Sequence, residues 1–438
     1  MGAVSLESTA AAAQKDNNNI RKDINWNTAR ANAQRTGTIN TSGPTPYTAT
    51  KWKRNLAGSM FSKEPVVADG TVYLAVTTNS DPTEGGGFIG AYDIETGNQQ
   101  WIQSDYPSPK TPTVGESLIY FATNVPEISK ENKGGLYGVE RESGDTVWSR
   151  KDTLKWTSPI VVGSRLYTSN SDGAYALNRK SGETIWRTKD IGMLTDGGDG
   201  ALSYANGTIF FSDGTALNAA DGSVKWRVTD SNSAFANHTI VDNRVYYLRT
   251  KYVENDNDVV TVESRSVRDG TVDWSHEIGG KNIIDRRFAV ADGHVLFFDS
   301  ERETITALNA KTGSQIWTKE LVGDYFSNFT IANGIIYIGG RYIDLTNPGI
   351  IQAAIHALDL KTGNREWSHL LDASNLTTSP EGMIGAGTPV VSAGKIFTTT
   401  YPAGSILDHH YIQYSNFFVL EASNSLPDGE RIIASQSK

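Results

Sequence analysis

Hydrophobic and polar residues alternate in short runs along most of this chain, and turn residues separate the runs. Valine, isoleucine, tyrosine and phenylalanine take alternate positions after a polar–glycine or Asp–Asn pair, which is typical of β-hairpins. Beyond the alanine-rich N-terminus, no segment sustains the 3.6-residue apolar period of a helix. We therefore predict an all-β protein with hairpins at residues 66–76, 114–123, 161–170, 204–213, 241–250, 290–300 and 331–340.

An eleven-residue phrase follows most of these hairpins and ends in tryptophan. It begins with a small residue and contains a Thr-Gly, Ser-Gly or Asp-Gly step four positions before the tryptophan, where glycine can adopt positive φ. Seven copies occur, with successive tryptophans 38 to 50 residues apart: Ala91–Trp101, Gly138–Trp148, Ala176–Trp186, Ala216–Trp226, Ser264–Trp274, Ala307–Trp317 and Ala357–Trp367. A repeat of this length that holds four short strands is a propeller blade.

An incomplete repeat remains at each end of the chain. The C-terminal part supplies strands at residues 388–394, 395–401 and 416–424 but has no tryptophan, whereas Thr48–Leu56 contains Trp52, 49 residues before Trp101. We predict an eight-bladed β-propeller of four-stranded antiparallel blades over residues 47–438, with the last blade closed by this N-terminal strand. Closure leaves no frayed sheet edge at the seam. Residues 24–46 form an N-terminal strap, and residues 1–23 are expected to be disordered or bound by a partner.

The repeated tryptophans have a structural explanation. An indole buries on the order of 200 Å², which at ~25 cal/mol per Å² is worth up to a few kcal/mol. The small residue of each phrase leaves a surface against which a flat indole can dock. We therefore interpret eight tryptophans as blade-docking residues and not as ligands: Trp52, Trp101, Trp148, Trp186, Trp226, Trp274, Trp317 and Trp367.

The amino-acid composition excludes several kinds of site and partner. The chain has no cysteine, so it can form neither a disulfide nor a cysteine–metal site. A net charge of −9 without a basic stripe argues against nucleic-acid binding. The chain contains no run of eighteen apolar residues, so we predict no membrane span. Residues 1–19 are not expected to form an intact secretory signal. We interpret the acidic stretches at Glu254–Asp258 and 196–200 as solvated turns. The two histidines after Asp408 are adjacent on an extended segment and point in opposite directions, so they are not expected to share one ion, and we predict no metal site.

The tryptophan phrase resembles the docking motif of the pyrroloquinoline-quinone (PQQ)-like eight-bladed propellers, and Trp26–Asn40 resembles the strap that precedes their first blade. The resemblance covers roughly residues 26–433. It implies the fold, but the family hosts both dehydrogenases and cofactor-free scaffolds. The dehydrogenases hold the quinone between a tryptophan floor and a ring of vicinal cysteines, with Ca²⁺ beside it. Here the cysteines are absent, and Trp156 is the one candidate for the floor. A scaffold branch carries a lipid-anchoring cysteine, which is also missing. We predict no cofactor.

Loop lengths indicate where a partner would bind. Long loops between the second and third strands occur at residues 79–87, 124–135, 341–352 and 402–415, in blades that are neighbours around the ring. Loops longer than closure requires are usually functional. The candidate partner-binding residues on them are Ile128, Tyr342, Ile343, Ile406 and Tyr411. Blade-to-blade loops provide a second candidate, the channel mouth, with Trp156, His238, Arg286, Arg287 and Tyr325.

These observations predict a non-catalytic binding or assembly module with a protein partner. Loops rich in threonine, serine, asparagine and glycine favour a secreted, cell-surface or virion-surface protein over a cytoplasmic one. One alternative is a PQQ- and Ca²⁺-dependent sugar or alcohol dehydrogenase, which a cluster of acidic ligands at the channel mouth would favour. The other is an attachment component of a virion or appendage, which partner contacts with residues 1–46 would favour.

Overall fold

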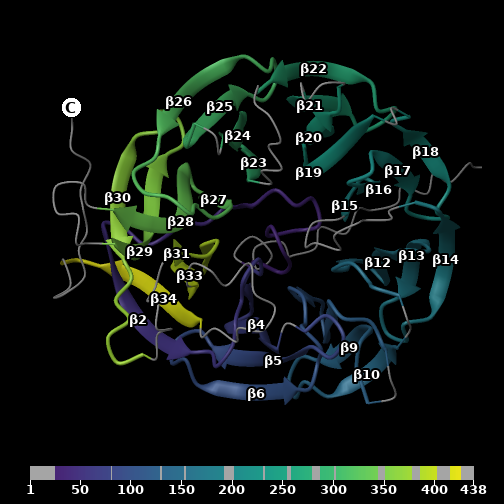
Figure 1. Ribbon diagram of the computed structural model, residues 1–438, viewed down its shortest axis with the longest axis horizontal. Coiled ribbons are helices and arrows are strands. Elements are labelled where there is room, and N and C mark those ends of the chain that lie inside the picture. The colour runs from purple at the N-terminus through teal and green to yellow at the C-terminus, as the bar shows by residue number, and fades with distance from the viewer. Residues whose placement is uncertain are drawn as a thin grey trace, which may run out of the picture.

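Eight antiparallel sheets form a closed ring in the computed structural model (Figure 1). The structure describes residues 25–79, 81–128, 131–151, 154–191, 202–229, 232–253, 258–278, 287–299, 302–343, 351–376, 385–401 and 415–425. These residues contain no helix, and so none that is long and apolar enough to cross a membrane. The prediction of an all-β, eight-bladed propeller is therefore confirmed.

Blades 1 to 7 each run in chain order from an inner strand near the ring axis to an outer strand on the rim, whereas the outer strand of blade 8 comes from the N-terminal part of the chain. Blade 1 consists of β3 (Val66–Ala68), β4 (Thr71–Asn79), β5 (Gly86–Asp93) and β6 (Gln99–Ser104). Blade 2 consists of β7 (Thr113–Val114), β8 (Leu118–Ala122), β9 (Leu136–Glu140) and β10 (Thr146–Arg150). Blade 3 consists of β11 (Ile160–Val162), β12 (Arg165–Asn170), β13 (Gly173–Asn178) and β14 (Thr184–Lys189). Blade 4 consists of β15 (Leu202–Ala205), β16 (Thr208–Phe211), β17 (Thr215–Asn218) and β18 (Val224–Arg227).

The second half of the ring follows the same plan. Blade 5 consists of β19 (Ser233–Val241), β20 (Arg244–Lys251), β21 (Val259–Ser266) and β22 (Val272–Glu277). Blade 6 consists of β23 (Phe288–Ala291), β24 (His294–Asp299), β25 (Thr304–Asn309) and β26 (Gln315–Glu320). Blade 7 consists of β27 (Phe329–Ala332), β28 (Ile335–Ile343), β29 (Ile351–Asp359) and β30 (Arg365–Leu370). Blade 8 contains β31 (Gly385–Ala386), β32 (Val390–Ser392), β33 (Lys395–Tyr401) and β34 (Asn416–Ser423).

The small residue of each phrase faces the tryptophan of its own blade across the strand pair. Ala176 is opposite Trp186 in blade 3, and Gly138 is opposite Trp148 in blade 2. A Cβ on Gly138 would lie only 2.5 Å from the Trp148 ring. The small residues that begin the phrases therefore make room for the indole within its own blade. A different residue, on the neighbouring blade, contacts the other side of the indole.

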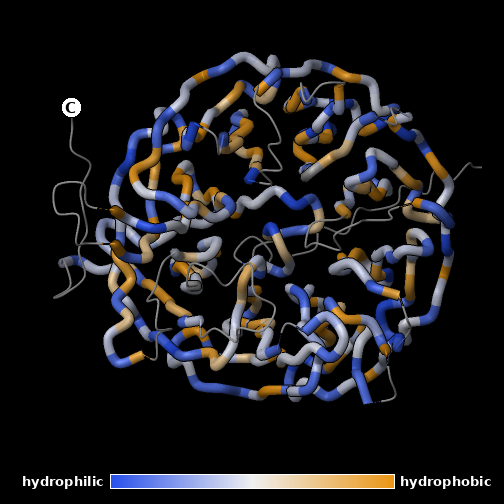
Figure 2. The backbone as a smooth tube through the Cα atoms, viewed as in Figure 1, coloured by the Kyte–Doolittle hydropathy of each residue, from blue (hydrophilic) through white to orange (hydrophobic). Residues whose placement is uncertain are grey.

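The core is divided among the gaps between blades. Among the described residues, the buried apolar side chains form eight large clusters, each shared by two adjacent blades. This is the expected result when both faces of every sheet pack on a neighbouring sheet. Along the rim, hydrophilic positions alternate with single hydrophobic ones (Figure 2). Stability is therefore spread around the ring, and it depends on every blade having two neighbours.

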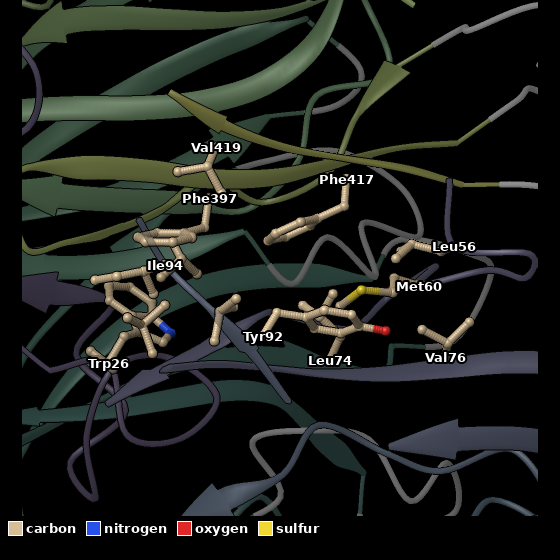
Figure 3. Packing of buried hydrophobic residues seen from close by; sticks show 14 residues of the cluster. Trp26, Leu56, Met60, Leu74, Val76, Tyr92, Ile94, Phe397, Phe417 and Val419 are labelled. Atoms are coloured by element: carbon tan, nitrogen blue, oxygen red, sulfur yellow. The ribbon is translucent and has the colours of Figure 1, made fainter. Parts of the chain in front are cut away.

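The N-terminal strand β2 (Tyr47–Asn55) closes the ring. It pairs antiparallel with β34 as the outer strand of blade 8, from Tyr47 opposite Ser423 to Asn55 opposite Asn416. The predicted closure is confirmed. The seam between blades 8 and 1 is filled by one apolar cluster, in which Trp26 lies beside Ile94 of blade 1 and Phe397 of blade 8 (Figure 3).

The segment before β2 crosses the centre of the ring (Figure 1). Its short strand β1 (Thr38–Ile39) pairs in parallel with β27 of blade 7. Backbone hydrogen bonds also connect the segment to the inner strands of blades 1, 2, 4, 5 and 7, through the carbonyl groups of Trp26, Asn27, Ala33, Gln34 and Gly37. We call residues 25–39 the strap. It joins inner strands that are distant from one another around the ring.

Candidate interaction surface

In the described part of the chain, seven of the eight docking tryptophans contact the turn of the next blade. The indole N–H donates to the carbonyl oxygen three residues before the glycine of that turn, at 2.8–3.1 Å. The indole ring covers the glycine itself, which has positive φ at each of these positions. The pairs are Trp52–Gly97, Trp101–Gly144, Trp148–Gly182, Trp186–Gly222, Trp226–Gly270, Trp274–Gly313 and Trp317–Gly363. The turn that Trp367 would reach lies outside the described residues. These tryptophans are occupied by structural contacts.

The strap places a charged group inside the channel. Arg30 is almost fully buried, and its guanidinium donates to the carbonyl oxygens of Phe329 in blade 7, at 2.6 Å, and Phe288 in blade 6, at 3.1 Å. The Glu64 carboxylate accepts from the Arg30 backbone N–H at 2.7 Å and from the Trp26 indole at 3.1 Å, and lies 3.6 Å from the Arg30 guanidinium. Burial lowers the pKa of Arg30, and the adjacent carboxylate opposes that shift. Arg30 and Glu64 thus connect the strap to blades 1, 6 and 7 at the centre of the ring.

The described residues do not fit PQQ with Ca²⁺. Trp156 is buried, with its ring centroid 5.0 Å from that of Tyr175 in a T-shaped arrangement and the Arg150 guanidinium 5.0 Å over its ring. The ring is therefore not exposed as a floor for a cofactor. No group of three or more histidine, aspartate or glutamate side chains that could hold a metal occurs in the described part of the chain. The sequence offers no cysteine for a ring.

The other channel-mouth candidates do not gather at one place. His238 is completely buried beside Tyr247, and burial lowers its pKa to about 3. Arg287 lies 3.9 Å over the Phe298 ring and donates to the Phe326 carbonyl at 2.8 Å. Tyr325 is exposed. Arg286 lies outside the described residues.

We call the face that carries the long loops at residues 79–87, 124–135, 341–352 and 402–415 the loop face. The candidate residues on these loops differ in their exposure. Ile128 in blade 2 is exposed, as expected of a partner-binding residue. Tyr342 is 9% exposed and packs on Ala354 and Leu370, so its expected exposure is wrong. Alternation along β28 explains this, because Arg341 and Ile343 take the outward positions on either side of Tyr342. Ile406 and Tyr411 lie outside the described residues, as do most of the acidic stretch before Asp258, residues 196–200 and the two histidines after Asp408.

Blade 7 presents an apolar patch on this face. The extended hairpin of β28 and β29 pairs Ile343 with Ile351, and Asp324 forms a backbone bridge with Arg341 beside them. The Asp324 carboxylate binds the Arg341 guanidinium through two hydrogen bonds, and that guanidinium covers the Tyr325 ring at 4.7 Å. Tyr325, 47% exposed, has φ of 50°, a strained value for a large side chain. We call Val322, Tyr325, Ile343 and Ile351 the blade 7 patch.

Blades 1 and 2 form a pocket with their long loops. The Asn132 amide donates to the Glu84 carbonyl at 3.3 Å, and Lys133 pairs with Asp105 at 3.2 Å, so the two loops touch. Between them lies a pocket of about 320 Å³, walled by Gly85–Phe88, Ser104, Asp105, Pro107 and residues 131–133 with Thr78 and Glu84. Between the lining residues Asp105 and Pro107, Tyr106 is buried and packs on Phe121 and Tyr137.

The fold is that of a known class of propeller. The family described as outer membrane protein assembly factor BamB matches residues 47–174, 170–282 and 266–407. These matches span most of the chain, and it therefore belongs to this family of PQQ-like propellers. No curated protein sequence matches it.

Solved structures with the same fold include proteins of different kinds. BamB from Moraxella catarrhalis is 13% identical, covering 87% of this chain and 100% of that one, with a TM-score of 0.57. Quinohemoprotein alcohol dehydrogenase from Comamonas testosteroni is 12% identical, covering 92% of this chain and 82% of that one, with a TM-score of 0.58. The computationally designed Ika8 protein is 11% identical, covering 83% and 98%, with a TM-score of 0.53. At these identities the likeness establishes the fold alone.

Sequence reasoning missed several residues of this surface. Val322 lies outside the loop segments that stood out by length, and Ile351 lies within the 341–352 segment but was not singled out. Asp324 and Arg341 become a pair only through the strand register. Arg30 and Glu64 are 34 residues apart and meet in the channel. The arginine-containing strap motif was the one available signal for them, since a buried arginine needs an acceptor or a carboxylate.

Proposed function

We propose that this chain is a non-catalytic propeller module that binds a protein partner through the loop face of blades 7, 8, 1 and 2. The observation that carries the proposal is the blade 7 patch, an exposed apolar surface around a fixed tyrosine–arginine pair. Tyrosine and arginine are enriched where interfaces bind most strongly, and exposed apolar patches mark binding sites.

Preorganisation supports the same assignment. Arg341 is held by Asp324, so its guanidinium does not lose side-chain freedom when a partner covers it. Strained backbone such as that of Tyr325 concentrates at functional sites, because the surrounding structure must hold it in place. The family's description as a protein assembly factor is consistent with an assembly role, at a cell or particle surface outside the cytoplasm.

Site-specific photo-cross-linking tests the proposal. A benzophenone amino acid is placed at Ile351 in the blade 7 patch, and at Val272 on the outer strand of blade 5 as a control of similar exposure, 52% against 48%. We expect a discrete protein adduct from position 351 in extracts of the source cells, absent from position 272 and abolished by Tyr325→Ala. Equal adducts from both positions, or an adduct that survives Tyr325→Ala, would contradict the proposal.

A further inference from the structure

The pocket between blades 1 and 2 is lined by both apolar and charged side chains. Phe88 is half-buried and Pro107 is buried, and the backbone of Gly85–Gly87 completes the lining. A Cβ on Gly87 would lie 2.5 Å from Pro109, and one on Gly85 would lie 2.9 Å from Pro107 and Val125. The loop therefore sits tightly against its neighbours, and the pocket exists before any ligand arrives.

The charges of the lining are unbalanced. Three carboxylates, Glu84, Asp105 and Glu131, share the lining with one ammonium group, Lys133. Lys133 is matched by Asp105 at 3.2 Å, which leaves the charges of Glu84 and Glu131 in excess. A ligand that complements this lining has an apolar stem for Phe88 and Pro107 and a cationic head for the carboxylates.

We propose that this pocket receives a lysine or arginine side chain of the partner protein. The inference rests on the proposed function, because the pocket lies on the same loop face, and it adds the chemistry of one anchor. Long basic side chains lay their methylene groups along apolar surface while the charged head stays hydrated, and the lining offers both apolar side chains and carboxylates. The net charge of −9 also attracts basic segments.

Peptide selection tests the proposal without the natural partner. Random heptapeptides displayed on phage are selected on the full chain, and enriched peptides are measured by calorimetry against the wild type and a Glu84→Gln, Glu131→Gln double variant. We expect one recurrent basic position, a loss of about tenfold in affinity when it becomes glutamine, and a similar loss in the double variant. Binding should weaken as salt rises, because both carboxylates are near solvent.

The matched control removes two carboxylates from the opposite face of blade 2. Glu142 and Asp145 are exposed on the turn between β9 and β10, so Glu142→Gln with Asp145→Asn changes net charge equally and should leave peptide affinity unchanged. Enriched peptides without a basic residue, or basic peptides that bind both double variants alike, would overturn the proposal. The Ile351 cross-link reports the proposed function separately, since neither variant alters blade 7.

Discussion

At the scale of single residues, this ring is built from a tryptophan and a glycine that meet across each blade boundary. The Trp226 indole donates to the Val267 carbonyl at 3.1 Å and covers Gly270, whose φ is 73°. Two properties of glycine are needed at once there, the positive φ and the missing side chain. Gly207 has nearly the same φ, 75°, but faces open space. Comparing Gly207 with Gly270 therefore separates the energetic cost of positive φ from the cost of placing a side chain against the indole.

Gly207→Ala should destabilise the fold by about 1–2 kcal/mol, the cost of a positive φ for an L-residue. Gly270→Ala should cost several kcal/mol more, because its Cβ would lie 2.7 Å from the Trp226 ring and the blade 4–blade 5 contact must open. Thermal unfolding by calorimetry measures both. Equal losses in the two variants would show that the indole does not depend on the glycine surface.

Buried histidines give the molecule an acid sensitivity. Burial lowers the pKa of His238 and His356 to about 3 and that of His369 to about 4, from an ordinary value of 6.5. Below pH 6.5 the unfolded chain binds protons that the folded chain does not, so stability falls as the pH decreases. Each histidine adds a slope of about 1.4 kcal/mol per pH unit.

Unfolding free energies should therefore decline steeply as the pH is lowered from 6.5 to 4.5. In His369→Gln the slope should be smaller by about 1.4 kcal/mol per pH unit, the contribution of one proton. His369 accepts or donates a 2.7 Å hydrogen bond with Thr48 of β2, so its protonation would act at the closing strand. A pH-independent stability in this window, or an unchanged slope in the variant, would contradict this expectation.

At the scale of elements, β2 holds the seam through three kinds of contact. Trp52 docks on the Gly97 turn, Arg54 donates to the Gly97 carbonyl at 2.8 Å, and Lys51 bridges Glu421 at 2.7 Å and Glu95 at 3.2 Å. Partly exposed ion pairs contribute little, whereas the docked indole and the strand pairing contribute most. The seam is thus an ordinary blade boundary whose outer strand comes from the other end of the chain.

A graded series tests this ranking. Glu95→Gln should cost less than about 1 kcal/mol, and Trp52→Ala about 3–5 kcal/mol. Deleting Thr48–Leu56 should cost more than either, because the whole edge of β34 is exposed and the Trp26 cluster loses its cover. Thermal unfolding measures the series. A deletion variant that unfolds at the temperature of the full chain would refute closure by β2.

At the scale of the whole molecule, the ring is fixed from outside by β2 and from inside by the strap. Arg30 reaches blades 6 and 7 while its partner Glu64 precedes the inner strand of blade 1. The centre of the ring therefore carries structural contacts between the strap and three blades.

Quinone chemistry is accordingly expected to be absent. With PQQ, Ca²⁺ and an artificial electron acceptor, alcohols and aldoses should give no turnover above the protein-free rate, and PQQ should not shift the thermal midpoint. Arg30→Ala should be assayed beside the wild type, because it removes the Arg30 guanidinium from the centre of the ring and leaves Trp156 unchanged. Quinone-dependent turnover by the wild type would replace the binding proposal with the enzymatic alternative.

The sequence by itself determined the architecture. Period-two alternation defines strands, and the spacing of the tryptophan phrase defines blades, because both signals depend on residues close together in the chain. The assignment of Trp52 to blade 8 also followed from counting. The role of the small residue that begins each phrase did not follow from the sequence. Cross-strand register decides that Gly138 faces Trp148 of its own blade, whereas Gly182 of the next blade receives the Trp148 indole.

Only the tertiary structure decided the surfaces. Tyr342 and Ile343 are neighbours in sequence, yet one is buried and the other faces outward, because strand direction at a loop's base sets the alternation. Tyr325 and Arg341 come from different loops and meet through a bridge between Asp324 and Arg341. The pocket likewise requires two blades to bring residues 84 and 132 together. Contacts between distant segments are fixed by packing around the ring, and no local pattern in the sequence encodes them.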